Sequence, residues 1–278
     1  MTTNDPTVAD PLPSFDNPPV IEVVCGVTYE PIEGLLAPHF GLLWKEYQPD
    51  YPEFKEVDLL LPVIESFVHE ERGGLGTNLP IRMPLLPRIW FISRDGTAVI
   101  QVQRDRFLHN WRKVSPSDSY PRYGNVITKF QKCLSTFQTF ISAHKLGGLK
   151  STQFEMCYIN HIPQGSGWNS LDEIGKIFPD FQWRSGNRFL TTPEGTNWRT
   201  TFVLPGQIGR LHATIQTAVR RSDNKPLLTL DLTVRGIGKD SSAEGMVSWF
   251  DTARKWIVNG FADLTGTEVQ EKIWKRTV

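Results

Sequence analysis

The sequence predicts an α+β fold in which antiparallel strands form one or two sheets and long helices pack on one face. First, segments rich in β-branched and aromatic residues alternate with stretches of helical periodicity. Second, residues 20–150 and 151–278 each show the order strand, helix, several strands, long helix. We therefore expect two β-α-β-β-α-like halves. The repeated order fits a pseudo-twofold axis and equally fits coincidence, because the halves share no evident sequence identity.

The N-terminal residues 1–19 hold five prolines and three aspartates and lack Lys and Arg. This composition predicts a flexible arm that is neither a secretory signal nor a membrane anchor. Residues 20–29 (VIEVVCGVTY) are rich in β-branched residues and predict a strand. The apolar spacing in 35–47 predicts a helix, and the prolines of 48–87 predict loop with short strands.

The clearest hairpin signal is Arg94-Asp95-Gly96, between strands predicted at 88–93 and 97–112. In 124–145, apolar residues recur at steps of three and four, which predicts a long amphipathic helix. The second half is predicted to hold strands at 154–162, 199–204, 210–220 and 226–235, a short helix at 170–178 and a long helix at 243–264.

Composition restricts the class of protein. Of 278 residues, 39% are hydrophobic and 22% charged, which is a globular balance. Thirty Lys and Arg balance thirty Asp and Glu, so the net charge is zero. The chain therefore lacks the overall positive electrostatic field that is expected of a general nucleic-acid binder. No segment reaches the ~18 consecutive apolar residues of a membrane span. Three widely spaced cysteines suit a reducing compartment, and we expect a cytoplasmic protein.

Charge is nevertheless segregated along the chain. Residues 15–71 contain twelve acidic residues and two lysines, whereas 81–122 and 184–239 contain eight and nine basic residues against three acidic residues each. Arginine, which binds carboxylate or phosphate with two parallel hydrogen bonds, dominates the basic segments. Two interpretations follow: the basic strands bind an anionic partner, or the acidic segment docks on them within the fold or across a dimer.

The most unusual stretch is 101–113, QVQRDRFLHNWRK, followed by Tyr120-Pro121-Arg122-Tyr123. Read as one strand, it places Arg104 and Arg106 on one face and Asp105, His109 and Trp111 on the other. Candidate ligand-binding residues are therefore Arg104, Asp105, Arg106, Asn110, Trp111, Arg112 and Tyr123. The alternative is structural, with solvated arginines, Trp111 in the core and Asp105 in a cross-strand pair.

Signatures of catalysis are missing from the sequence. HExxH, CxxC, GxGxxG, GxSxG and a P-loop do not occur. We therefore predict no metal site, no cofactor and no catalytic residue, although a triad assembled in space leaves no such signature.

Four blocks resemble a sporadically distributed family of prokaryotic proteins of about this length, to which no activity or catalytic residues are assigned. These blocks are NPPVIEVVCGVTYEP, IQVQRDRFLHNWRK with YPRY, YINHI, and WFDTARKWIVNGFADLTGTEVQEKIWKR. The resemblance implies no role for any single residue. The patchy distribution of the family implies a mobile or defence-associated gene.

The sequence thus favours a non-enzymatic binding or regulatory module that presents an arginine-lined sheet surface to a protein or an anionic small molecule. One alternative is an enzyme that acts on a phosphorylated or nucleotide-like molecule, with Asp105 or His109 as acid or base. A further alternative is a nucleic-acid-binding protein. A membrane is not an expected partner, and a homo-oligomer is compatible with each of these functions.

Overall fold

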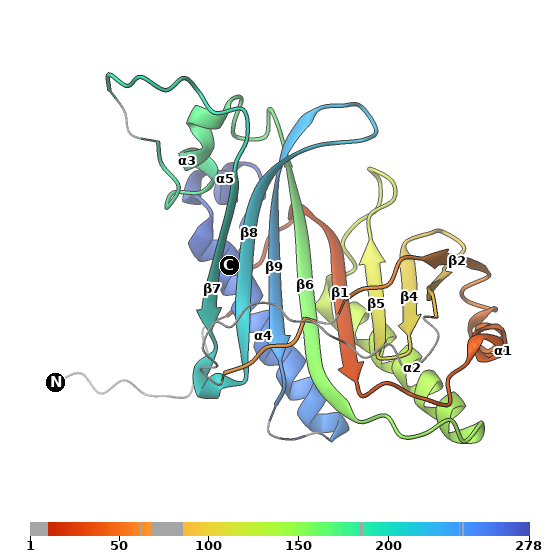
Figure 1. Ribbon diagram of the computed structural model, residues 1–278. Helices are drawn as coiled ribbons and strands as arrows, with labels where there is room; N and C mark the ends of the chain where they lie inside the picture. Colours follow the sequence, from red (N-terminus) through yellow and green to blue (C-terminus); the bar gives the residue numbers. More distant parts are fainter. Residues whose placement is uncertain (1–10, 62, 68–85, 184–185, 239, 241) are drawn as a thin grey trace.

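A nine-stranded antiparallel sheet dominates the computed structural model, which describes residues 11–61, 63–67, 86–183, 186–238, 240 and 242–278 (Figure 1). Its strands are β1 (Val20–Tyr29), β2 (Glu53–Val57), β3 (Arg88–Ile92), β4 (Ala98–Gln103), β5 (Arg106–Arg112), β6 (Ser151–Pro163), β7 (Asn197–Val203), β8 (Gly209–Val219) and β9 (Pro226–Gly236). The helices of the same residues are α1 (Ala37–Tyr47), α2 (Arg122–Ala143), α3 (Ile174–Ile177), α4 (Ala243–Leu264) and α5 (Thr267–Lys272).

The strand order is β2-β3-β4-β5-β1-β6-β9-β8-β7. Strands β1 and β6 pair in the middle, so the strands of the first half extend to one edge and those of the second half to the other. The expected α+β class, with antiparallel strands and helices on one side, is confirmed. The pseudo-twofold relation between the halves stays a prediction.

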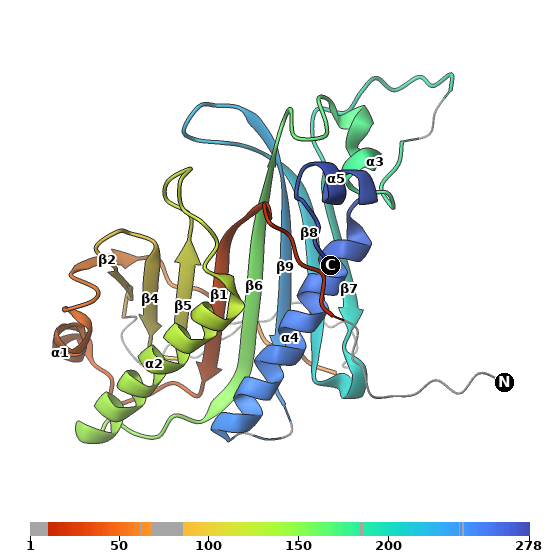
Figure 2. The ribbon, with the colours of Figure 1, turned by 180° about the vertical axis from the view of Figure 1, so that it is seen from behind.

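Helices α2 and α4 cover one face of this sheet (Figure 2). Each turns an apolar stripe toward the strands, and the rings of Phe130 in α2 and Phe250 in α4 meet at 5.1 Å between centroids. Phe137 of α2 stacks on Phe107 of β5 at 5.2 Å. A shared aromatic core therefore joins the two halves beneath the helices. None of the helices in the described ranges is both long and apolar enough to cross a membrane.

The N-terminal arm differs from expectation in its described part, residues 11–19. Phe15 is buried and packs edge-on against Phe261 of α4 at 5.3 Å. The backbone of Asp16 and Asn17 hydrogen-bonds to that of Lys275 and Trp274. These residues are therefore held against the C-terminal segment, because an aromatic side chain and main-chain bonds anchor them. Residues 1–10 of the expected arm lie outside the described residues.

The segment 97–112 is two strands rather than the single strand that the sequence predicts. β4 and β5 form a hairpin whose loop contains only Arg104 and Asp105, and Gln103 pairs with Arg106 across it. The two-residue loop changes the phase of the alternation, so Arg104 and Arg106 do not share a face as expected. Arg106 and Asn110 face away from α2, whereas Phe107 and Trp111 pack into the core beneath it.

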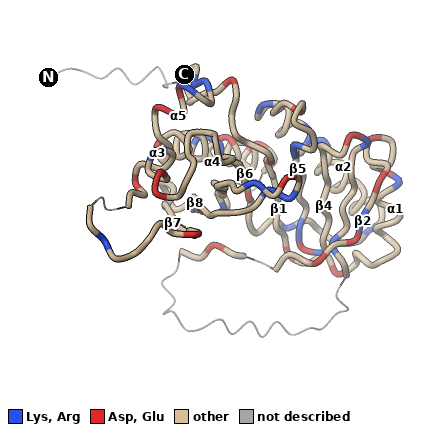
Figure 3. The backbone as a smooth tube through the Cα atoms, turned by 90° about the horizontal axis from the view of Figure 1, so that it is seen from above, with Lys and Arg blue, Asp and Glu red and all other residues tan. Residues whose placement is uncertain are grey.

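The face opposite α2 and α4 is rich in polar side chains, and we call it the polar face. Alternation and register place on it Glu22, Thr28, Gln101, Gln103, Arg106, Asn110, Gln153, Glu155, Arg210, His212, Thr229, Asp231, Thr233 and Arg235. An extended segment, residues 58–61 and 63–67, crosses this face (Figure 3). We call this segment the strap.

Candidate functional site

Asn110 belongs to a hydrogen-bonded chain inside the polar face. Its side chain accepts a hydrogen bond from Gln101 at 2.8 Å and donates one to Glu22 at 2.5 Å. The Gln101 carbonyl oxygen in turn accepts from Arg88 at 2.8 Å and from Trp90 at 3.0 Å. Burial raises the pKa of Glu22, while the bond from Asn110 opposes that rise. The expected ligand contact at Asn110 is thus occupied by protein groups.

Three other predicted site residues bind main-chain or neighbouring groups. Arg104 donates to the carbonyl of Leu35 through Nε at 3.2 Å and through a terminal nitrogen at 3.0 Å. Asp105 accepts from the Gln103 side chain at 2.8 Å. Arg112 donates to the Gly96 carbonyl at 2.9 Å. These contacts fix the loops at the ends of β4 and β5.

Arg106 is different, because its buried Nε has no hydrogen-bond partner among the described residues. The residue is 7% exposed, and its Nε has no hydrogen-bond partner. No carboxylate of the described residues lies within 4.0 Å of it. Arg106 lies under the strap, between Gln103 of β4 and Thr28 of β1.

Trp111 and Tyr123 lie on the helix side of the sheet and lead to a cavity between α2 and α4. The ring of Trp111 is buried and packs on Tyr120 at 5.4 Å, behind the cavity wall. Tyr123, in the first turn of α2, lines the cavity itself. Of the seven predicted residues, Tyr123 alone is in its lining.

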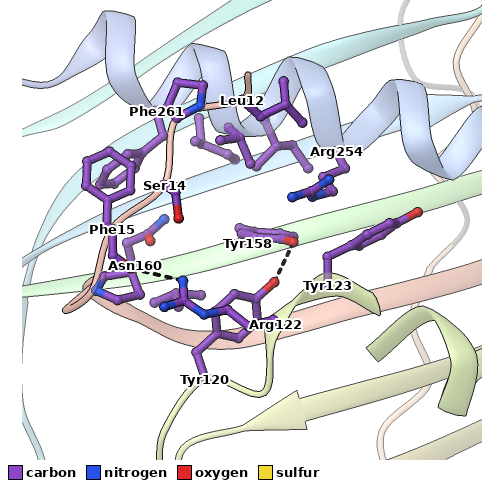
Figure 4. Close-up of a pocket in the computed structure, with 16 residues that line it drawn as sticks. Leu12, Ser14, Phe15, Tyr120, Arg122, Tyr123, Tyr158, Asn160, Arg254 and Phe261 are labelled. Carbon is purple, nitrogen blue, oxygen red and sulfur yellow. Dashed lines mark hydrogen bonds between the residues drawn. The ribbon is translucent and has the colours of Figure 1, made fainter. Parts of the chain in front are cut away.

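This cavity has a volume of ≈ 330 Å³ and a mainly apolar and aromatic wall (Figure 4). Its floor is formed by Tyr158 and Asn160 of β6, and one side by Ile257 and Phe261 of α4. Its polar groups come from the residues Ser14, Tyr120, Arg122, Tyr123, Tyr158, Asn160 and Arg254. An apolar pocket with a few converging polar groups is the usual form of a small-molecule site.

Two guanidinium groups reach the cavity from different helices. Arg254 of α4 lies over the ring of Tyr123, 4.9 Å from its centroid. Arg122 begins α2 and donates to the Phe15 carbonyl at 2.9 Å. Among the described residues, neither guanidinium has a carboxylate within 4.0 Å. The positive end of the α2 dipole adds to their field, because α2 starts at this wall.

Arg122 adopts a backbone conformation that a side chain normally avoids. Its φ is 68°, in the left-handed region, which costs roughly 1–2 kcal/mol for an L-residue. Non-glycine residues held there cluster at ligand sites.

The tyrosine hydroxyls around the cavity are neutral. Burial raises the pKa of Tyr120 to about 12 and also raises the pKa of Tyr123 and Tyr158. The Tyr123 hydroxyl donates a hydrogen bond to the Asp251 carboxylate at 2.8 Å, so its proton is not available to a ligand. Tyr120 and Tyr158 share one hydrogen bond at 2.8 Å, which uses one of their two protons. The other proton is available to an acceptor.

A second hollow, of ≈ 680 Å³, lies at the end of the central strands near Pro163. Its arginine, Arg220, forms an ion pair with Asp223 at 2.5 Å. The cation is thus already neutralised, and this hollow offers a weaker anion site than the cavity between α2 and α4.

The geometry gives no support to acid–base roles for His109 or Asp105. His109 is 1% exposed and its Nε2 lies 3.1 Å from the hydroxyl of Tyr51. Burial lowers the pKa of His109 to about 3, so the ring is neutral. Asp105 lies in the β4–β5 loop, whereas His109 packs on the helix side. Within the ranges that the structure describes, no three His, Cys, Asp or Glu side chains cluster as a metal site requires.

Sequence analysis missed Arg254 and Tyr158, because the cavity is assembled from separate segments spread between Leu12 and Phe261. A partial signal existed in Tyr120-Pro121-Arg122-Tyr123, where aromatic and basic residues adjoin the start of a long helix. Comparison of the chain with protein-family models, curated proteins and solved structures found no match.

Proposed function

We propose that this protein is a non-enzymatic binding module for a small amphipathic anion, with a carboxylate or phosphate group on an apolar body, held between α2 and α4. The observation that carries the proposal is the convergence of Arg122 and Arg254 on an apolar cavity, where no carboxylate of the described residues lies within 4.0 Å of either guanidinium. A cation next to an apolar wall is poorly solvated, so an incoming anion gains both charge pairing and burial.

In this proposal each polar group makes a different contact with the ligand. Arg254, stacked on Tyr123, is the principal anion contact, and Arg122 closes the site from the α2 side. The free proton of the Tyr120–Tyr158 pair donates a further hydrogen bond. The apolar body of the ligand packs against Ile257 and Phe261.

Hexyl phosphate, hexanoate and hexanol are the probes that test this proposal, because they share an apolar chain and differ in charge. Isothermal titration calorimetry should give at least tenfold tighter binding of hexyl phosphate than of hexanol, since a charge-assisted hydrogen bond contributes about 1.5–3 kcal/mol. Arg254→Met, which keeps much of the side-chain volume, should remove that difference and leave hexanol binding unchanged.

Arg94→Met is the matched control, because Arg94 is exposed in the β3–β4 turn, away from the cavity. This variant should bind hexyl phosphate as the wild type does. Equal affinity for hexyl phosphate and hexanol, or an unchanged preference in Arg254→Met, would show that the cavity does not recognise anions.

A further inference from the structure

The strap is attached to the polar face by side chains that bind its main chain. Gln103 accepts from the Leu60 amide at 3.0 Å and donates to the Leu60 carbonyl at 3.0 Å. Gln153 accepts from the Glu65 amide at 2.8 Å and donates to the Val63 carbonyl at 2.7 Å. Each carboxamide thus pairs with an extended peptide as a neighbouring strand would, whatever the side chains of that peptide are.

One side chain of the strap is recognised as well. The carboxylate of Glu65 accepts from Arg210 at 2.9 Å and contacts His212 Nε2 at 2.5 Å. The Arg210 guanidinium also lies over the ring of Phe67 at 4.0 Å. These contacts lower the pKa of Glu65, although burial opposes the change. An acidic residue is therefore the anchor that this end of the polar face selects.

The two carboxamides that bind the strap belong to a row of side chains in register across four strands. Gln103, Arg106, Thr28 and Gln153 form one row over β4, β5, β1 and β6, and all four are buried. The strap crosses this row from Gln103 on β4 to Gln153 on β6 (Figure 3). Within the row, the strap leaves the Arg106 Nε unpaired. A buried guanidinium N–H without a partner costs free energy that a carboxylate from another chain would recover.

Polar contacts, rather than apolar burial, hold the strap. Leu61 is 77% exposed and Ile64 is 68% exposed, so these side chains contribute little hydrophobic stabilisation. Segments with few buried apolar contacts open at a lower free energy than the core does. We therefore expect the strap to leave the row at a lower free energy than the core requires to unfold.

We propose that this row, with Arg210 and His212, is a binding site for an extended acidic polypeptide segment of a partner protein, and that the strap occupies the site in the free protein. The partner segment supplies main-chain groups to Gln103 and Gln153 and carboxylates to Arg106 and Arg210. The site lies on the face opposite the cavity between α2 and α4, so it is independent of the anion-binding function proposed above.

A fluorescein-labelled peptide with the sequence of residues 57–67, VDLLLPVIESF, which includes the strap, is the probe, and the Glu65→Gln variant of the full chain is the receptor. In the wild type the tethered strap competes at an effective concentration in the millimolar range, so the peptide should bind weakly. Glu65→Gln loosens the strap, and fluorescence anisotropy should show at least tenfold tighter binding of the peptide. A peptide with Gln in place of its Glu should lose that gain.

Two variants built on Glu65→Gln locate the site. Adding Arg210→Met should abolish the preference for the acidic peptide. Arg199→Met, which removes an exposed arginine on β7 that forms no ion pair with the described strap residues, should not. Adding Arg254→Met should leave peptide binding unchanged, which separates this proposal from the cavity. If folded Glu65→Gln binds the peptide no better than the wild type does, the strap is a permanent part of the fold and the proposal is wrong.

Hydrogen exchange of the wild type gives a second test that needs no variant. The amides of Leu60 and Glu65 should exchange at least about a hundredfold faster than those of the central strand β1, because the strap opens locally. Equal protection of the strap and of β1 would mean that the strap leaves only on global unfolding, which contradicts the proposal.

Discussion

Asp231 shows how strongly the polar face perturbs a single carboxyl group. It lies on β9 between Ile159 of β6 and Thr214 of β8, and its Oδ1 is buried without a hydrogen-bond partner. Burial raises the pKa of Asp231 to about 6, and the charge of Glu22 adds to this rise. The folded protein therefore binds more protons than the unfolded chain between about pH 4 and 6, and it loses stability as the pH rises through this window.

Asp231→Asn should accordingly stabilise the protein at pH 7.5 by roughly 1 kcal/mol, a value reduced for the partial exposure of the group to water. Below about pH 3 the difference should vanish, because the carboxyl is then protonated in both states. Urea denaturation at about pH 2.8, 6 and 7.5 measures the free energy of unfolding of wild type and variant, with the exposed Asp180→Asn as control. A stabilisation independent of pH would refute the electrostatic explanation.

Within the elements, local sequence signals identified most helices and strands but not every turn. The helix predicted at 243–264 coincides with α4, whose N-cap Ser242 accepts from the Gly245 amide. Gly96, in the predicted hairpin turn, has a φ of 72°, as that turn requires. The Arg104-Asp105 turn contains no Gly, Pro or Asn, so nothing in the sequence distinguished it from strand. Because this turn was not predicted, the predicted faces of the β5 residues relative to those of β4 were the reverse of the observed ones.

The close approach of β8 and β9 depends on a pair of glycines. Gly209 and Gly236 are opposite each other, and a Cβ on Gly236 would lie 2.1 Å from the Ile208 carbonyl oxygen. Gly236→Ala should therefore destabilise the protein by about 2 kcal/mol or more, because a backbone atom cannot move aside cheaply.

Gly41→Ala is the control for Gly236→Ala, because it makes the same substitution at a site with open space. Gly41 lies on the exposed side of α1 with open space around its Cα, so alanine should stabilise the helix by about 0.5–1 kcal/mol. Urea denaturation at pH 7.5 measures the free energy of unfolding of both variants. If Gly236→Ala were neutral, the contact between β8 and β9 would not be as tight as described.

For the whole molecule, sequence analysis recognised the segregation of charge but could not decide between its two interpretations. The structure shows one contact of the intramolecular kind, since Glu65 of the acidic segment binds Arg210 of a basic strand. These residues are 145 positions apart, and only the sheet order brings them together. The cavity was beyond prediction for the same reason, as its wall combines the N-terminal segment, the start of α2, β6 and α4.

A crystal structure with bound 6-bromohexanoate tests the anion-binding function most directly, because anomalous scattering locates the bromine unambiguously. We expect one molecule between α2 and α4, with its carboxylate within about 3 Å of the Arg254 guanidinium and its bromine against Ile257 and Phe261. A bromine signal elsewhere on the molecule, or an empty cavity at a concentration that saturates binding in solution, would contradict the proposed site.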